Sequence, residues 1–197
     1  MCQREAENKS ACATPDFRKP LPRPAACRME ARMAAQKLRE FLDNQGIPYT
    51  TISHAVAYTA KETAALTHIS SKELAKTVIV KIGSELAMAV LPASYEIDLP
   101  SLRAATGARS VCLAKESEFK DRFLECEIGA MPPFGNLYGM LVYVDESLTK
   151  DTDIAFNAGA HNECLQVSYA DFERLVKPKV LRFSELPDVE SIGAWHL

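Results

Sequence analysis

The sequence predicts an α+β protein built around a mixed sheet, and three observations support this. Two apolar runs rich in Val and Ile, at 77–82 and 86–91, are separated by Gly83-Ser84-Glu85, which is typical of a β-hairpin. Other segments have apolar residues at helical spacing or carry helix-capping signals. The predicted strands and helices do not alternate in the strict order that builds a doubly wound parallel sheet.

Five helices are predicted. After about residue 30, apolar residues recur at helical spacing until Gly46 and Pro48 end the pattern. Thr59 and Glu62 have the spacing of a capping box at the start of a second helix. The other predicted helices are 99–106, closed by Gly107, then 115–123, and 170–176, stopped by Pro178. Besides the hairpin, strands are predicted at 110–113, 141–144, 154–157 and 164–167.

The chain of 197 residues is long enough for one well-buried core, flanked by two tails. Residues 1–28 contain four prolines and few large apolar side chains, so we expect a disordered tail. The domain is expected over 29–185, with a C-terminal tail at 186–197. The first 28 residues have a formal charge of +3 and the remainder −6, from a total of −3. An acidic domain lacks the broad basic face that grips long nucleic acid, so DNA is not an expected partner.

The six cysteines form no CxxC pair, which indicates a reducing compartment rather than a disulfide framework. His161 and Cys164 have a spacing that fits two metal ligands, but no second pair accompanies them, so no metal site is expected. Cys112, Cys126 and Cys164 lie in or beside apolar runs, where thiols are usually inert. No apolar run could span a bilayer, and no signal peptide follows Met1. A cytoplasmic protein without membrane contact or cofactor is expected.

Lys76 is the first candidate for chemistry. It has the same strand parity as Val78, Val80 and Ile82, so it begins a row of side chains facing the core, while Thr77, Ile79 and Lys81 take the other face. An inward-facing lysine needs either a route to solvent past the sheet edge or a polar cleft. Parity alone leaves both interpretations open.

Two glycine-containing segments could build such a cleft. In 127–136, Pro132 and Pro133 restrict the backbone between Gly129 and Gly135, so the segment can hold amides toward a developing oxyanion, or can simply be a rigid turn. In 157–163, a turn of small residues presents His161, which could orient water or bind a substrate hydroxyl or amine, or could be exposed and inert.

Three segments together resemble the YbaK-like aminoacyl-tRNA deacylase family, which includes the prolyl-tRNA synthetase editing domain: Leu74-Ala75-Lys76-Thr77-Val78-Ile79-Val80, Gly129-Ala130-Met131-Pro132-Pro133-Phe134-Gly135 and Asn157-Ala158-Gly159-Ala160-His161. The similarity runs from about Met33 to Lys179. It implies a mixed, mostly antiparallel and partly barrel-like sheet surrounded by helices. It also implies trans-editing, the hydrolysis of the ester of mischarged aminoacyl-tRNA.

The resemblance implies site residues as well. Lys76 matches the family's essential lysine and would anchor the carbonyl or a phosphate. The substrate-binding residues implied are Thr77, Gly129, Met131, Pro132, Pro133, Phe134, Gly135, Gly159, Ala160 and His161. Among them, Met131, Pro132, Phe134 and His161 would line a small pocket that rejects bulky amino acids.

The implied substrate is the tRNA acceptor end carrying a small or hydroxylated residue such as Ser, Ala or Thr. An aminoacyl-tRNA synthetase is left open as a second partner. Two alternatives remain open: a catalytically silent module that binds tRNA or a synthetase, and a hydrolase of small aminoacyl esters or thioesters.

Overall fold

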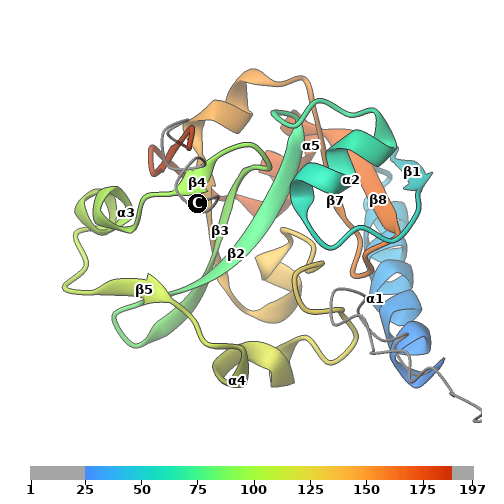
Figure 1. The fold of residues 1–197 in the computed structure, drawn as a ribbon, viewed down its shortest axis with the longest axis horizontal. Helices are drawn as coiled ribbons and strands as arrows, with labels where there is room; N and C mark the ends of the chain where they lie inside the picture. Colours follow the sequence, from blue (N-terminus) through green and yellow to red (C-terminus); the bar gives the residue numbers. More distant parts are fainter. Residues whose placement is uncertain (1–24, 188–197) are drawn as a thin grey trace, which may run out of the picture.

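The computed structural model describes residues 25–187, with side chains from Met33 onward, and its centre is a mixed sheet with helices on both faces (Figure 1). The helices are α1 (Ala25–Asn44), α2 (Ala60–Thr67), α3 (Leu99–Thr106), α4 (Glu116–Phe119) and α5 (Tyr169–Val176), with 3₁₀ turns η1 (Lys120–Arg122), η2 (Gly135–Tyr138) and η3 (Glu146–Lys150). The strands are β1 (Thr50–Ser53), β2 (Leu74–Ile82), β3 (Glu85–Pro92), β4 (Glu96–Ile97), β5 (Val111–Leu113), β6 (Leu141–Asp145), β7 (Asp153–Asn157), β8 (Glu163–Ser168), β9 (Lys179–Leu181) and β10 (Ser184–Glu185).

The strands form one large sheet and one small one. The large sheet runs β1-β8-β7-β2-β3-β6-β9, with β5 added to β2, and the small sheet pairs β4 with β10. Antiparallel pairs join β1 to β8, β7 to β8, β2 to β3, β2 to β5 and β4 to β10, while the β2–β7, β3–β6 and β6–β9 pairs are parallel. The predicted α+β fold with a mixed, mostly antiparallel sheet is confirmed. The sheet is open between β1 and β9, so the barrel-like closure expected from the resemblance does not occur.

The predicted elements agree with the structure except at their ends. The β2–β3 hairpin, the capping box of α2 and the helix closed by Gly107 are confirmed. The helix predicted at 115–123 is shorter, because α4 ends at Phe119 and continues as a 3₁₀ turn. The boundary of the predicted N-terminal tail is also corrected, because α1 already begins at Ala25. Residues 1–24 and 188–197, which include most of both predicted tails, lie outside the described residues.

Both faces of the sheet are covered, so both rows of β2 side chains pack against a core cluster. Ala75 and Ile79 point into the largest core cluster, together with α1, α5 and the aromatic side chains of the second half of the chain. Val78 and Val80 point to the opposite face, where a smaller cluster contains Leu102 of α3 and Phe183. The two predicted rows are therefore correct, but the main core lies on the face of Thr77 and Ile79, whereas the prediction placed the core on the face of Lys76.

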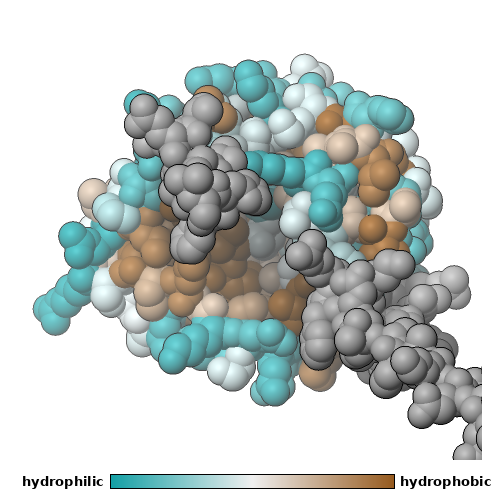
Figure 2. Space-filling view, viewed as in Figure 1, coloured by the Kyte–Doolittle hydropathy of each residue, from teal (hydrophilic) through white to brown (hydrophobic). Residues whose placement is uncertain are grey.

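The second face is more thinly covered than the first. Ala64 of α2 packs there on Leu74 and Ala155, and α3 packs beside it on the second cluster. In Figure 2, hydrophobic side chains gather in a hollow over β2 and β3, next to α3 and β5. The partly buried apolar residues packed against this second cluster are Val78, Ile82, Tyr95, Ile97, Leu99, Val111 and Leu181. Within the described residues, no helix is both long and apolar enough to cross a membrane.

Candidate active site

Lys76 lies on the second face, at the point in the β2 row that separates two apolar clusters. Leu74 before it belongs to the cluster under α2, and Val78 after it packs against the cluster under α3. The Lys76 side chain is partly buried, and its Nζ donates hydrogen bonds to the main-chain oxygens of Tyr95 and Ala93. Its ammonium forms no ion pair with any described carboxylate. Lys76 is therefore a cation held by carbonyl dipoles.

The surroundings of Lys76 lower the pKa of its ammonium below the ordinary value. Burial is the largest cause, because the apolar surroundings disfavour the charged form. The positive charge of Lys61 on α2 lowers the pKa further, while the negative charge of Glu96 on β4 opposes both. These effects favour an anion or a polarised oxygen as a further partner of Lys76.

Two different strands pair with β2 on the two sides of Lys76, and a gap lies between them. β7 pairs with Leu74 and Ala75, and β5 pairs with β2 only from Val80 onward. Thr77 lies in the gap, with its side chain on the main-core face, opposite to Lys76. Its Oγ1 is buried and has no hydrogen-bond partner among the described residues. Buried polar atoms of this kind are uncommon in folded proteins, and the Thr77 hydroxyl is free to bind water or a polar group of a ligand.

The Gly129 and Gly159 turns are joined by hydrogen bonds. The Gly159 amide donates to the Ala130 oxygen at 2.9 Å, and the Glu127 amide donates to the Gly159 oxygen at 2.8 Å. Both glycines have positive φ, +91° and +101°, a conformation that side chains disfavour. Two segments thirty residues apart in the sequence thus form one double turn. β7 leads directly into this double turn. Phe156 of β7 pairs with Ala75 of β2, and Asn157, the next residue, is the last of β7.

His161 is a buried part of this double turn, only 4% exposed. Its amide donates to Glu127 Oε2 at 2.8 Å, and its Nε2 lies 2.9 Å from the Ile128 oxygen. Because that oxygen can only accept, Nε2 carries the proton in the neutral ring and Nδ1 is an acceptor. Nδ1 is buried without a hydrogen-bond partner. The Tyr58 ring, whose centroid lies 5.2 Å from that of His161, packs beside the imidazole.

The proline-rich part of the Gly129 loop is core structure. Phe134 is fully buried, and its ring packs on Phe41, Phe156 and Phe172. Pro132 and Pro133 are also buried. The Met131 side chain turns back so that its Sδ accepts a hydrogen bond from the Gly129 amide at 3.2 Å. The expectation that Met131 and Phe134 line a pocket is corrected accordingly: their side chains fix the loop from the main-core side.

Gly135 shows why this loop needs a glycine at its end. A Cβ built on Gly135 would lie 2.5 Å from Val142 Cγ2 and 2.6 Å from the Met140 oxygen. The loop therefore packs so closely on β6 that any side chain at this position would displace it.

Sequence reasoning did not identify two contributors to this arrangement. The Glu127 carboxylate fixes the His161 amide, and the segment before α2 closes over it through Tyr58 and through the Ala57 amide, which donates to the His161 oxygen at 2.9 Å. The position of Glu127 beside Gly129 is the only local signal for the first. The second is a long-range contact with no sequence signature.

Other chemistries find less support. The Cys164 thiol is buried, which raises its pKa to about 12, and burial also raises the pKa of Cys126. Neither is an activated nucleophile. Across residues 25–187, no group of three or more His, Cys, Asp and Glu side chains is arranged to hold a metal ion. A solvent-open groove at the far end of β2 contains no predicted site residue; it is lined by Lys81, Ser84, Glu85, Leu86, Glu118, Arg122, Gly139 and Leu141.

Comparison with known proteins decides the family. Residues 54–175 match the model of the aminoacyl-tRNA editing domain, which covers more than half of the chain. The chain belongs to the aminoacyl-tRNA editing domain family. This confirms the family predicted from the three motifs and, with it, the editing of aminoacyl-tRNA as the class of activity.

Individual relatives agree with this assignment. The multifunctional Ser/Thr-tRNA deacylase ProXp-y of Escherichia coli is 26% identical over 153 residues, which are 75% of this chain and 91% of the relative. A crystal structure of a proposed trans-editing enzyme for prolyl-tRNA synthetase superposes with a TM-score of 0.68 at 18% identity, covering 77% of this chain and 97% of that one. A hypothetical protein of known structure gives the same TM-score at 24% identity, covering 76% and 99%. These two structures show a shared fold.

Proposed function

We propose that this editing domain acts in trans on mischarged tRNA in the cytoplasm and hydrolyses the ester that joins the amino acid to the terminal adenosine. The observation that carries the proposal is the environment of Lys76. An ammonium has three N–H donors, and two of them meet the Tyr95 and Ala93 oxygens. The third remains for a substrate carbonyl or phosphate, in surroundings of low polarity where a charged hydrogen bond is strong.

We propose that the double turn supplies further donors to the developing oxyanion. The Gly159 amide already donates to the Ala130 oxygen, so it is not one of them. The Ala160 amide donates no hydrogen bond to any described group, and the Gly129 amide meets only the thioether of Met131, a weak acceptor. Both amides are held in fixed directions, which is what electrostatic stabilisation of a transition state requires.

His161 and Thr77 are proposed to recognise the amino acid, Thr77 through the gap that β7 and β5 leave at the edge of β2. The unpartnered Nδ1 of His161 can accept a hydrogen bond from a hydroxyl or an ammonium group. The unpartnered hydroxyl of Thr77 can donate or accept. A small hydroxylated residue such as serine or threonine suits these partners, in agreement with the Ser/Thr-tRNA deacylase among the relatives. A substrate lacking the hydroxyl would leave a buried polar atom unpaired, which is a strong basis for discrimination.

The attacking water is proposed to be activated by the substrate. No described carboxylate pairs with Lys76, and the acceptor nitrogen of His161, Nδ1, is assigned in this scheme to the hydroxyl or ammonium group of the amino acid. The ribose hydroxyl beside the ester is well placed to assist. In this scheme Lys76 is a positioning cation and neither a nucleophile nor a base.

The test is a deacylation screen of the purified protein against tRNAs charged with Ser, Thr, Ala, Cys and Pro. We expect serine and threonine to be released fastest, and Lys76→Ala to reduce the rate by about 100-fold, the loss typical of one transition-state donor. Lys81→Ala is the matched control, because Lys81 lies on the same strand but on the other face and pairs with Glu118 at 2.8 Å. Wild-type rates on every substrate after Lys76→Ala would refute the mechanism.

The same screen addresses the two alternatives. A silent binding module, including one that docks on an aminoacyl-tRNA synthetase, would bind charged tRNA without turnover. A hydrolase of small aminoacyl esters would act equally on an ester lacking the acceptor stem. A rate that depends strongly on the acceptor stem favours the proposal over both.

A further inference from the structure

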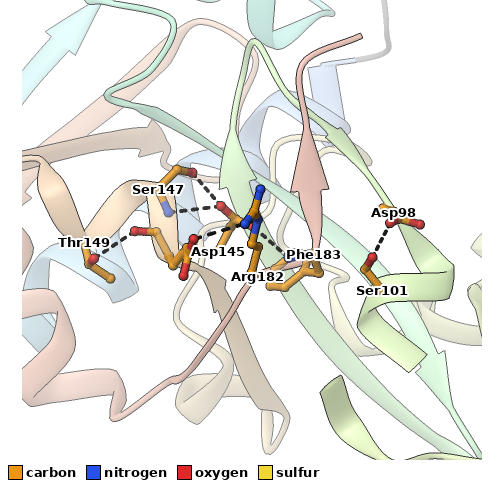
Figure 3. Close-up of polar contacts among 8 residues, drawn as sticks. Asp98, Ser101, Asp145, Ser147, Thr149, Arg182 and Phe183 are labelled. Atoms are coloured by element: carbon orange, nitrogen blue, oxygen red, sulfur yellow. Dashed lines mark hydrogen bonds and ion pairs between the residues drawn. The ribbon is translucent and has the colours of Figure 1, made fainter. Parts of the chain in front are cut away.

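Asp145, at the end of β6, is a buried carboxylate without a cationic partner among the described residues. It is 2% exposed and takes part in none of the described ion pairs. Its Oδ1 accepts from the amide and the hydroxyl of Ser147, at 3.0 and 2.6 Å, and its Oδ2 accepts from the Phe183 amide at 2.9 Å (Figure 3). The bonds from Ser147 are a local cap of η3. The bond from Phe183 ties the C-terminal segment to the sheet.

Phe183 is held in place by its side chain, its amide and its carbonyl. Its side chain is fully buried in the cluster on the second face, with Leu91 and Leu102. Its amide donates to Asp145 (Figure 3), and its carbonyl accepts from the Asp98 amide at 2.8 Å. The residues that follow form β10, which pairs with β4 through Ser184 with Ile97 and Glu185 with Glu96.

β4 in turn carries the partner of Lys76. Tyr95, whose carbonyl accepts from the Lys76 ammonium, directly precedes β4, and Glu96 is the charge that opposes the lowering of the lysine's pKa. A two-residue strand has little stability of its own, so β4 depends on its pairing with β10. The C-terminal segment lies outside residues 54–175 that match the family model.

We propose that Asp145 and Phe183 are positioning residues for Lys76. They hold β10 against β4 and thereby fix the Tyr95 carbonyl that orients the ammonium. The role of Lys76 in catalysis rests on the proposed function, whereas the control of its position does not.

The first test is Asp145→Asn in the full chain. Asparagine has one acceptor oxygen where Asp145 uses both, so either the Phe183 or the Ser147 hydrogen bonds are lost. We expect kcat for deacylation to fall about 10-fold with little change in KM, because small misplacements of a reacting group reduce the rate strongly. Ser147→Ala is the matched control, since it removes one hydrogen bond to the same carboxylate but leaves the bond from Phe183.

The second test acts on β10 directly. Glu185→Pro removes a main-chain donor from the two-strand ladder without altering Asp145 or the core. The same loss of kcat is expected. Arg182→Gln is its control, because the Arg182 side chain is 83% exposed and, among the described residues, pairs only with Glu146, at 3.9 Å. If Asp145→Asn does not fold, Glu185→Pro tests the positioning role of the β4–β10 pair in its place.

A third readout does not depend on activity. The reactivity of the Lys76 amine toward acetic anhydride is followed over pH by mass spectrometry. In Asp145→Asn and Glu185→Pro, the midpoint should differ from that of the wild type, because the burial of the ammonium and its distances to the Tyr95 oxygen and Glu96 all change. In both controls it should stay where the wild type has it.

The outcomes separate the two proposals. If both variants keep the wild-type kcat and the wild-type labelling midpoint while Lys76→Ala is inactive, the positioning role is overturned and the proposed function stands. If the midpoint shifts as expected but the wild-type protein hydrolyses none of the charged tRNAs, the proposed function fails and the positioning of Lys76 stands.

Discussion

The two faces of the sheet are built differently. On the main-core face, α1, α5 and an aromatic cluster around Phe134 form one continuous apolar core. On the other face, α2, α3, β4 and β10 cover two smaller clusters, and Lys76 lies between them. The first face supplies most of the buried apolar area, and the second holds a charged group in partly apolar surroundings. Stability and chemistry are therefore expected to respond to substitutions on different faces.

The largest effect on stability is expected for Phe134→Ala. Removing this fully buried ring should lower the free energy of unfolding by about 3–5 kcal/mol, measured by denaturant titration. KM per folded molecule should stay near the wild-type value, because the ring faces the core. Leu113→Ala, at a side chain that is 52% exposed on the other face, is the control and should cost about 0.5 kcal/mol or less. A normal stability with a raised KM would instead make Phe134 a pocket wall.

The next effect compares the two glycines at the ends of one 3₁₀ turn: Gly135 is the first residue of η2, and Gly139 directly follows its last. Gly135→Ala places a methyl group against the Met140 oxygen and should cost about 3 kcal/mol. Gly139→Ala meets no atom within 4 Å, and its φ of +63° should cost only about 1 kcal/mol. Thermal unfolding of both variants checks the order. Equal losses would show that the close packing of the loop on β6 is not what requires Gly135.

Much of this fold could be predicted from the sequence, since local patterns determine it. The hairpin of β2 and β3, the capping box at Thr59 and the stop at Gly107 all involve residues close together in the chain. The short strands β1, β4, β9 and β10 have no such pattern, because pairing with distant segments creates them. The open edge of the sheet follows from the same long-range pairings.

The candidate site was predictable to a similar extent. The glycines and His161 carried visible signals, and the structure joins them into one double turn. The parity of β2 placed Lys76 in one row with Val78, Val80 and Ile82 but could not show which face of the sheet holds the larger core. The burial of Phe134 could not be predicted from the sequence, because an aromatic residue in a loop is equally compatible with a pocket wall. Only the aromatic neighbours contributed by α1, β7 and α5 distinguish the two.

A pH profile tests the charge on the second face. Because burial lowers the pKa of Lys76 and the cation is the active form, the deacylation rate should be constant below that pKa and fall above it. The fall should be about 10-fold per pH unit once spontaneous ester hydrolysis is subtracted. Glu96→Gln removes the charge that raises the pKa, so the fall should begin at lower pH. Lys61→Gln removes a charge that lowers it, so the fall should begin at higher pH. Shifts in the opposite directions would exclude Lys76 as the titrating group.

The smallest effect compares one helix cap on each face. Thr59 caps α2 over the second face through the Glu62 amide at 3.2 Å, and Ser168 caps α5 over the main core through the Asp171 amide at 3.1 Å. Thr59→Ala and Ser168→Ala should each lower the free energy of unfolding by about 1 kcal/mol. Only Thr59→Ala should also change the deacylation rate, because α2 packs on the face of Lys76 and Tyr58, the preceding residue, lies beside His161. If both variants reduce the rate equally, the reduction reflects general stability, and the functional separation of the two faces is wrong.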